Sequence, residues 1–312
     1  MAAGHIAMRH GFQGPNHAAT TACTTGAHSI GDASRFIALG DADVMLAGGS
    51  ESCIHPLTFA GFGRARSLST AFNDNPTSSC RPFDAGRNGF VVSEGAAVCV
   101  LEELEHAKAR GANIYAEVRG YGCSGDAYHM TAPREDGNGA YLAMKRALRS
   151  AGIRPSQVDY INAHATGTQV GDVAEAAAIR RLMLGEGGVS SEAQVTVSST
   201  KGAIGHLLGA AGAIEALFCI LAVHEVRSSG PSITVAASLL TYNTGHDTSY
   251  AQPRAARCGH RLQFCALGSA AEKGWRSRNQ QLRIWRHQQQ PRDISVRMSR
   301  RTVPPCTATY FV

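Results

Sequence analysis

The chain has 312 residues, of which 44% are hydrophobic and 17% charged, and its formal net charge is +6. This length allows one large α/β domain or two smaller ones, and it excludes a short scaffold held together by disulfides. No apolar run approaches the roughly 20 residues that span a bilayer, so we expect a soluble globular protein without a membrane span.

The positive charge is confined to the last part of the chain. Residues 1–225 hold 17 Lys and Arg against 21 Asp and Glu, a net charge of −4, whereas residues 226–312 hold 13 against 3, a net charge of +10. The segment 226–312 shows neither a helical nor a strand period, so we predict no domain there.

The nine cysteines have no paired spacing, no CxxC and no Cys/His set at the spacing of zinc ligands. This pattern predicts a reducing compartment and no metal site. The first residues also lack the basic stretch and apolar core of a signal peptide.

The first elements follow from apolar periodicity. A helix is predicted over 24–39, ending at Gly40. Two strands and a charged helix come next, at 44–47, 95–101 and 102–110. Residues 60–88 lack a period and are expected to form functional loops.

Strands and helices then alternate along the chain. The predicted strands are 114–120, 158–163 and 195–198. The predicted helices are 139–150, 172–184 and 206–224, of which the last is almost wholly apolar and is expected to be buried. This alternation predicts an α/β fold with a parallel sheet and helical crossovers.

Cys23 lies at the predicted start of the first helix. Free N–H groups and the positive end of the helix dipole lower the pKa of a thiol there, which makes Cys23 a candidate nucleophile. An isolated cysteine is more often simply buried, so Cys23 alone does not decide between the two interpretations.

Two histidines and a lysine strengthen the catalytic interpretation. His164 directly follows a predicted strand, at the end of the sheet where α/β proteins gather functional groups. Lys201 and His206 follow the next predicted strand. Each histidine alone is more often a satisfied core or loop residue, but the combination with Cys23 predicts an active site.

Three segments resemble the active-site motifs of one enzyme family: TACTTGAHS, INAHATGTQVGDVAE and VSSTKGAIGHLLGAAGAIEA. They are similar to those of the elongating, decarboxylating β-ketoacyl-[acyl-carrier-protein] synthases of the thiolase-like superfamily. FAGFGRARSLS, CRPFD and GFVVSEG also resemble that family, and the resemblance covers residues 1–225. Details such as Asn16-His17-Ala18 look most similar to the mitochondrial enzymes of eukaryotes.

The resemblance implies a thiolase-like fold, in which two related α/β halves form layers of helices and sheets, and a homodimer. Residues 1–112 would be the remainder of the amino-terminal half, 113–225 the carboxyl-terminal half without its last strands, and 226–312 a basic tail foreign to the family. The implied reaction is the decarboxylative condensation of malonyl carrier with an acyl-enzyme thioester in type II fatty-acid elongation. The implied partner is acyl carrier protein, whose phosphopantetheine holds the substrates, and no further cofactor is expected.

The resemblance also implies a role for each candidate residue. Cys23 is acylated by the growing chain. His164 and His206 hold the malonyl thioester carbonyl and promote loss of carbon dioxide, as two N–H donors to a developing oxyanion. Lys201 anchors the surrounding hydrogen bonds.

The resemblance gives other residues supporting roles in binding the substrate or orienting the site. Thr166 and Thr168 match positions that contact the phosphopantetheine arm. Asp172 and Glu175 orient the site in the family, although stabilisation of a helix N-terminus explains them equally well. Arg64 and Arg66 suit either an acidic carrier protein or simply a solvated loop. Gly205, Gly209 and Gly212 suggest close helix packing and not a nucleotide-binding loop.

By the resemblance, the chain is short at both ends. Family members begin with a further α/β segment and end with a GFGGTN segment, which does not occur after Glu225. One possible set of codons for QQLRIWRHQQQPRDI, residues 280–294, reads NSFGFGGTNSSLVI when the frame moves forward by one base. We therefore expect a change of reading frame close after Glu225, and we expect this chain to be poorly folded or inactive.

Two alternatives remain at this point. In the first alternative, the chain is an inactive fragment of such an enzyme, although the presence of Cys23 favours a catalyst. Otherwise the basic tail is an arm for nucleic acid or a membrane surface, which no binding motif or amphipathic stripe supports, so no nucleic-acid partner is expected. The resemblance implies the mitochondrial matrix, with the targeting segment not present in this chain, and otherwise the cytoplasm.

Overall fold

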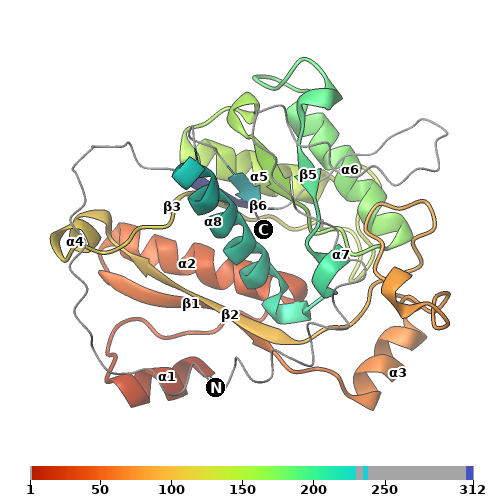
Figure 1. Ribbon diagram of the computed structural model, residues 1–312, viewed down its shortest axis with the longest axis horizontal. Helices are drawn as coiled ribbons and strands as arrows, with labels where there is room; N and C mark the ends of the chain where they lie inside the picture. Colours follow the sequence, from red (N-terminus) through yellow and green to blue (C-terminus); the bar gives the residue numbers. More distant parts are fainter. Residues whose placement is uncertain (1, 230–234, 238–306, 312) are drawn as a thin grey trace. The chain divides into compact units, whose positions relative to one another are not determined.

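The computed structural model describes residues 2–229, 235–237 and 307–311. All of them belong to one unit of the chain, made of residues 1–254 and 306–312. Two sheets and a central pair of helices organise this unit (Figure 1). The rest of the basic segment lies outside the described residues.

The first sheet is an antiparallel pair of strands, β1 (Val44–Glu51) and β2 (Gly95–Glu102). Side chains alternate between its two faces. Ala47 and Ala97 point inward and are buried, whereas Leu46 and its neighbour across the pair, Val100, are exposed on the outward face.

The second sheet has the strand order β3-β7-β6-β4-β5, and all its pairs are parallel. The strands are β3 (Glu117–Gly122), β4 (Tyr160–Asn162), β5 (Val197–Ser198), β6 (Val235–Ala237) and β7 (Thr307–Phe311). Parallel pairing agrees with the predicted alternation of strands and helices. β6 and β7 come from the segment 226–312, whose sequence shows no strand period.

Two helices, α2 (Thr25–Leu39) and α8 (Ala211–Ser229), pack against each other and contact strands of both sheets. A Cβ on Gly212 would lie 2.7 Å from the Cβ of Ala27, so only glycine permits this approach. The predicted close packing at Gly212 is confirmed. Buried residues of α2, β1 and α8 form one core cluster: Ile30, Ala33, Ala47, Ala216, Cys219 and Val223.

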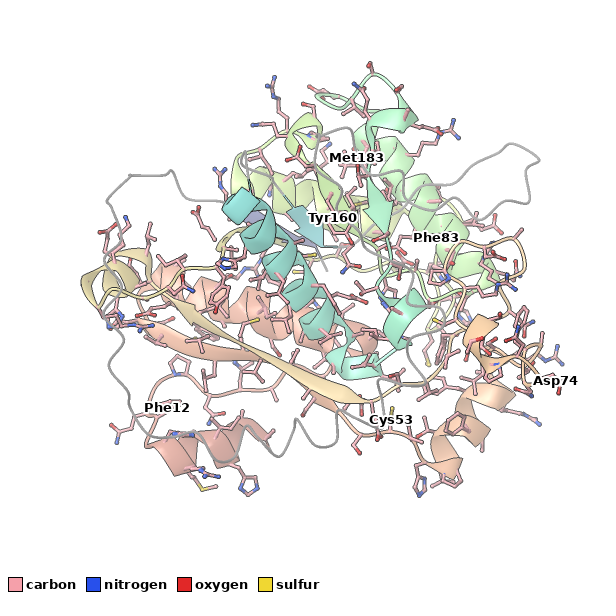
Figure 2. All side chains as sticks on the ribbon, in the orientation of Figure 1. Phe12, Cys53, Asp74, Phe83, Tyr160 and Met183 are labelled. Carbon is pink, nitrogen blue, oxygen red and sulfur yellow. The ribbon has the colours of Figure 1, made fainter. Side chains whose placement is uncertain are left out.

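A second core cluster joins α5 (Asn138–Ala151) and α6 (Gln169–Met183) to β4. Its larger members are Met144, Leu148, Ile161, Ile179, Leu182 and Met183. Phe83 belongs to the long segment 52–94 that connects β1 to β2, called here the excursion. It packs against the same cluster and is labelled with Met183 in Figure 2. The excursion is thereby held beside the ends of β4 and β5.

Four shorter helices complete the α-helices of the described residues: α1 (Ala2–His10), α3 (Pro56–Arg64), α4 (Leu104–Ala109) and α7 (Lys201–Ile204). α3 occupies part of the stretch expected to be loops, because His55 caps it by accepting a hydrogen bond from the Leu57 amide. The apolar helix begins at Ala211 and not at residue 206, because the residues before it form a 3-10 turn, Leu208–Ala210, in which Leu208 has φ of +45°. In the described part of the chain, no helix combines the length and the apolar character needed to cross a membrane.

Candidate active site

Cys23 lies in a 3-10 turn, Ala22–Thr24, that leads into α2. Ala22 has φ of +50°, a left-handed conformation that is uncommon for a residue with a Cβ. One turn further along, Nδ1 of His28 lies 2.6 Å from the Thr21 hydroxyl and ties the start of α2 to this turn. The turn presents the thiol at the helix N-terminus, as the sequence predicts.

The electrostatic expectation for the thiol is wrong. Burial raises the pKa of Cys23, and the nearby Lys201 ammonium opposes this effect without cancelling it. Desolvation disfavours the thiolate more than the surrounding charges and the backbone favour it. Cys23 is therefore a protonated thiol at neutral pH and needs a proton acceptor in order to act as a nucleophile.

His206 supplies such an acceptor. Its Nε2 lies 2.9 Å from the Cys23 Sγ, although 183 residues separate the two in sequence. The backbone of His206 is fixed between Val91 and Ser93, accepting from the Ser93 amide at 3.0 Å and donating to the Val91 carbonyl at 2.8 Å. Burial, with a smaller effect of Lys201, lowers the pKa of His206 to about 3, so the imidazole is neutral.

His164 follows β4 and faces the same thiol. Its ring lies edge-on to that of His206, with 5.4 Å between the centroids. Lys201 donates a hydrogen bond to Nδ1 of His164 across 3.2 Å. Burial and the adjacent ammonium hold the pKa of His164 well below its usual range. Since an ammonium only donates, Nδ1 accepts and the proton of this neutral imidazole lies on Nε2.

Lys201 is itself held by a carboxylate that the sequence analysis did not single out. Its Nζ donates to Oε1 of Glu215 on α8, and the two residues are 1% and 6% exposed. Burial raises the pKa of Glu215, and the ammonium opposes that rise. A signal was available, because Glu215 is the one charged residue between Leu207 and Val223.

Glu175 fixes the backbone of the His164 loop. Its two oxygens accept from the amide of His164 at 2.9 Å and from the amide of Ala165 at 2.8 Å. Burial raises the pKa of Glu175 to about 7. Of the two interpretations given to this carboxylate, the contacts agree with orientation of the site.

Thr166 and Thr168 lie on the loop that connects β4 to α6. Their hydroxyl oxygens are 3.1 Å apart, and both residues are half-buried. Asp172, in the first turn of α6, accepts from the Gly167 amide at 3.1 Å and from the Phe83 amide at 2.8 Å. It therefore joins the threonine loop to the excursion before β2.

Two aromatic rings pack in succession next to His206. Phe90 lies edge-on to the His206 ring with centroids 5.2 Å apart, and Phe62 lies edge-on to Phe90 at 5.1 Å. Both phenylalanines lie in segments that resemble the family, FAGFGRARSLS and GFVVSEG, although the sequence alone gives them no role. Arg64 and Arg66 are exposed, at the end of α3 and just beyond it.

The three reactive side chains have the donor set of a metal site. The ligand atoms of Cys23, His164 and His206 all lie within 4.8 Å of one another, and thiolate and imidazole are the usual ligands of zinc. The contact with Lys201 argues against that use, because a metal needs the free lone pair of a ring nitrogen. The nitrogen of His164 that is not bound to Lys201 carries a proton, so the arrangement fits an N–H donor better than a metal ligand.

Comparison with known proteins gives two family matches. Residues 1–107 match the model described as beta-ketoacyl synthase, N-terminal domain, and residues 115–228 match beta-ketoacyl synthase, C-terminal domain. The first match contains Cys23, and the second contains His164, Lys201 and His206.

Curated relatives align with the same part of the chain. A mitochondrial 3-oxoacyl-[acyl-carrier-protein] synthase of Arabidopsis thaliana is 62% identical over 225 residues, which are 72% of this chain and 48% of the relative. A putative mitochondrial 3-oxoacyl-[acyl-carrier-protein] synthase of Schizosaccharomyces pombe is 61% identical over 225 residues, covering 72% of this chain and 52% of the relative. The chain thus spans about half the length of these relatives.

Solved structures have a similar fold. A structure described as a type II PKS acyl-carrier protein in complex with its ketosynthase bound to the hexaketide is 35% identical, with a TM-score of 0.69 over 78% of this chain and 57% of that one. A beta-ketoacyl synthase from Burkholderia phymatum is 44% identical, with a TM-score of 0.61 over 66% of this chain and 48% of that one.

Proposed function

The chain belongs to the beta-ketoacyl synthase family and has its thiolase-like fold, and from this premise we propose that its site performs the 3-oxoacyl-[acyl-carrier-protein] synthase reaction of fatty-acid elongation. The observation that carries the proposal is the 2.9 Å contact between the Cys23 Sγ and Nε2 of His206, with the His164 ring beside it. The identity to named synthases supports the same reaction.

In the first step, Cys23 takes the acyl group from an acyl carrier protein thioester. The thiol proton passes toward His206, and the sulfur forms a bond with the thioester carbonyl carbon. The bond from that carbon to the carrier's sulfur then breaks, and the carrier leaves as a free thiol after it receives the proton. The raised pKa of Cys23 makes the neighbouring neutral imidazole necessary for this step.

In the second step, malonyl carrier replaces the free carrier. The bond between its carboxylate carbon and its methylene carbon breaks, and the electron pair forms an enolate as carbon dioxide leaves. The enolate carbon attacks the acyl-Cys23 carbonyl, the carbon–sulfur bond breaks, and the Cys23 thiolate takes up a proton from solvent. The Nε2–H of His164 stabilises the enolate oxygen, and His206 joins it in the tautomer that carries its proton on Nε2, since fixed donors in a buried site lower the energy of a developing oxyanion.

The remaining residues position these groups. Lys201 holds His164 in the tautomer with its proton on Nε2, and Thr166 and Thr168 receive the phosphopantetheine arm of the carrier. The exposed guanidinium groups of Arg64 and Arg66 suit an acidic carrier protein. The partner is acyl carrier protein and the assembly a homodimer, as for the elongating synthases that the sequence resembles.

We propose a mitochondrial location for the protein because similar synthases are named as mitochondrial enzymes. Two of them are named as mitochondrial enzymes, and the sequence has no arrangement of cysteines that would require an oxidising compartment. Imaging of the chain with a carboxyl-terminal fluorescent tag, expressed from its own gene, tests this, and signal confined to the cytoplasm contradicts it.

Acylation of Cys23 is the direct test of the proposed activity. The full chain is incubated with radiolabelled acyl carrier protein, and the labelled peptide is mapped. We expect label on Cys23 that is lost in Cys23→Ser and retained in Cys99→Ser, a matched change at another half-buried cysteine. Absence of label, while a full-length relative is labelled under the same conditions, supports the alternative of an inactive fragment.

A change of reading frame after about Glu225 explains the basic segment. The family match ends at residue 228, and the alignment to the Arabidopsis relative covers 225 residues. Synonymous codons for residues 280–294 permit the string NSFGFGGTN in the shifted frame, which supports the same origin. Sequencing the transcript across codons 220–295 tests it, and a single unbroken frame shared by transcripts of related strains would remove the idea.

A further inference from the structure

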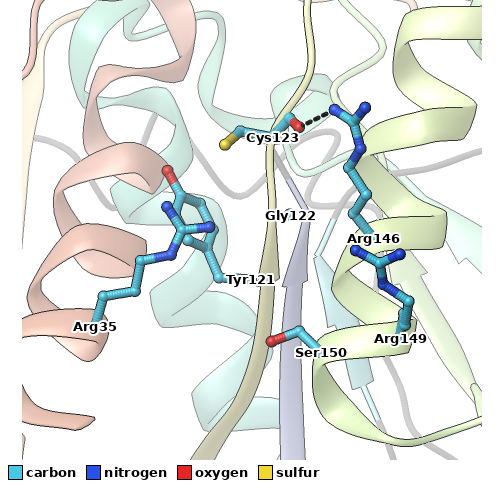
Figure 3. A pocket seen from close by; sticks show the side chains of 7 residues that line it. All are labelled: Arg35, Tyr121, Gly122, Cys123, Arg146, Arg149 and Ser150. Carbon is cyan, nitrogen blue, oxygen red and sulfur yellow. Dashed lines mark hydrogen bonds between the residues drawn. The ribbon is translucent and has the colours of Figure 1, made fainter. Parts of the chain in front are cut away.

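A surface pocket of about 300 Å³ lies between α2 and α5, beside the end of β3 (Figure 3). Seven residues line it: Arg35, Tyr121, Gly122, Cys123, Arg146, Arg149 and Ser150. None of them belongs to the candidate active site. The volume is at the lower end of the range of small-molecule sites.

The lining is strongly basic and contains no carboxylate. Arg35 comes from α2, whereas Arg146 and Arg149 come from α5. Arg146 and Arg149 are three residues apart, so their side chains leave the same face of that helix. Figure 3 shows Arg35 on one side of the pocket and the other two on the opposite side.

Each guanidinium keeps hydrogen-bonding capacity. Arg35 lies over the Tyr121 ring at 4.3 Å and reaches an Asp32 oxygen outside the pocket only at 3.9 Å. Arg146 donates one Nη1 bond to the Cys123 carbonyl at 2.7 Å. Among the described residues, the Arg149 side chain has no hydrogen-bond or ion-pair partner. Three cations that share a small pocket repel one another, and an anion between them removes that cost.

The α5 wall of the pocket is rigid. A Cβ on Gly122 would lie 2.2 Å from the Ala143 carbonyl oxygen and 2.4 Å from the Ala147 amide nitrogen, so α5 sits directly on β3. Ala143 and Ala147 are buried in this contact. The backbone that carries Arg146 and Arg149 is therefore held in place before any ligand arrives, which reduces the entropic cost of binding.

We propose that this pocket binds a phosphate group, as inorganic phosphate or as a small phosphate monoester, between the guanidinium groups of Arg35, Arg146 and Arg149. The planar forks of arginine match the spacing of phosphate oxygens. A phosphate dianion offers enough acceptor oxygens for three guanidiniums, and the Ser150 hydroxyl adds a further donor at the pocket edge. The volume leaves room for a small organic group on the ester.

Calorimetric titration of the full chain with inorganic phosphate at constant ionic strength tests the proposal. We expect one saturable site, and at least tenfold weaker binding in the double variant Arg146→Gln/Arg149→Gln. The control Lys145→Gln/Arg154→Gln removes the same charge close by, outside the pocket lining, and should bind within twofold of the unaltered chain. Arg149→Lys, which keeps the charge but loses the fork, should also weaken binding.

Two results would overturn the proposal. One is the absence of saturable binding at millimolar phosphate, and the other is an equal loss in the pocket and control variants, which would show general attraction to a basic chain. Thermal unfolding of each variant checks that it folds like the unaltered protein. Glycerol 3-phosphate, with glycerol as the uncharged control, separates the two sources: tighter binding than phosphate identifies an ester, and equal or weaker binding identifies free phosphate.

This inference does not depend on the proposed function. The titration requires no catalysis, and Cys23→Ser should leave phosphate binding unchanged.

Discussion

Lys201 donates to Nδ1 of His164 across 3.2 Å, and this contact fixes which nitrogen of the imidazole carries the proton. A neutral histidine with an occupied Nδ1 lone pair presents Nε2–H toward Cys23 and His206. The ammonium is held in turn by Glu215 on α8. A hydrogen-bond donor in the site thus depends on an ion pair in the protein interior.

The first prediction separates the structural and chemical roles of that ion pair. Lys201→Met leaves Glu215 buried without a partner and should lower the free energy of unfolding by about 3–5 kcal/mol. Lys201→Met/Glu215→Leu removes both polar groups and should recover most of this loss. Neither variant should decarboxylate malonyl carrier at more than about a hundredth of the original rate, because the His164 tautomer is no longer fixed. Urea unfolding and a carbon dioxide release assay measure the two quantities.

A contradictory outcome is easily recognised. If the double variant regains both stability and decarboxylation, the ion pair serves only the fold.

The second prediction concerns the reactivity of Cys23 with pH. Its pKa is raised and that of His206 is lowered to about 3, so both groups are neutral at pH 7 and the thiolate fraction is small. The rate of Cys23 alkylation by iodoacetamide should therefore rise steadily from pH 6 to pH 9 without a plateau. A rate that stays constant between pH 5 and pH 8 would instead indicate a thiolate–imidazolium pair. Mass spectrometry of the Cys23 peptide separates its reaction from those of the other cysteines.

The third prediction follows from Glu175, whose pKa rises to about 7. The folded state then binds a proton between pH 4.5 and pH 7 that the unfolded state has already released, so this carboxyl makes stability fall as pH rises through that window. In Glu175→Gln this contribution disappears. The difference in unfolding free energy between the original chain and the variant should shrink by up to about 3 kcal/mol from pH 4.5 to pH 7.

Taking this difference removes the pH dependence of the two buried histidines, which acts in the opposite direction. Their lowered pKa values make stability fall as pH decreases below about 6.5. Urea titrations at a series of pH values provide the data, and a difference that stays constant would contradict the raised pKa of Glu175.

The fourth prediction tests the approach of α2 to α8. Gly212→Ala would place a Cβ 2.7 Å from the Cβ of Ala27, so one helix must shift, at a cost of about 1–3 kcal/mol. Gly202→Ala is a matched control, because its Cβ would meet Pro82 at an ordinary distance of 3.6 Å. Because α2 carries Cys23 at its start, Gly212→Ala should also slow acylation of the thiol. Equal stability of the two variants would show that the helices are not closely packed.

Much of the site was predictable because its residues lie at the ends of regular elements. The apolar period of α2 and its stop at Gly40 place Cys23 at a helix start. The parallel sheet brings His164, after β4, close to Lys201, after β5. Both placements depend on local periodicity and on the rule that the carboxyl ends of parallel strands share one edge.

Other features depend on packing, which a single sequence does not display. The direction of the Cys23 pKa was predicted wrongly, because the helix N-terminus is visible in the sequence and burial is not. The start of α8 was predicted too early, because a 3-10 turn with a left-handed Leu208 interrupts the apolar stretch without changing its composition. Glu215 went unnoticed because its importance arises only when Lys201 lies beside it.

The two carboxylates of α6 have a mechanical consequence. Glu175 accepts hydrogen bonds from the amides of His164 and Ala165. Asp172 accepts one from the amide of Gly167, which lies between Thr166 and Thr168. A displacement of this helix would therefore carry the imidazole and both threonine hydroxyls with it as one rigid body. The distance between the His164 imidazole and the hydroxyls of Thr166 and Thr168 is thus set by a single helix.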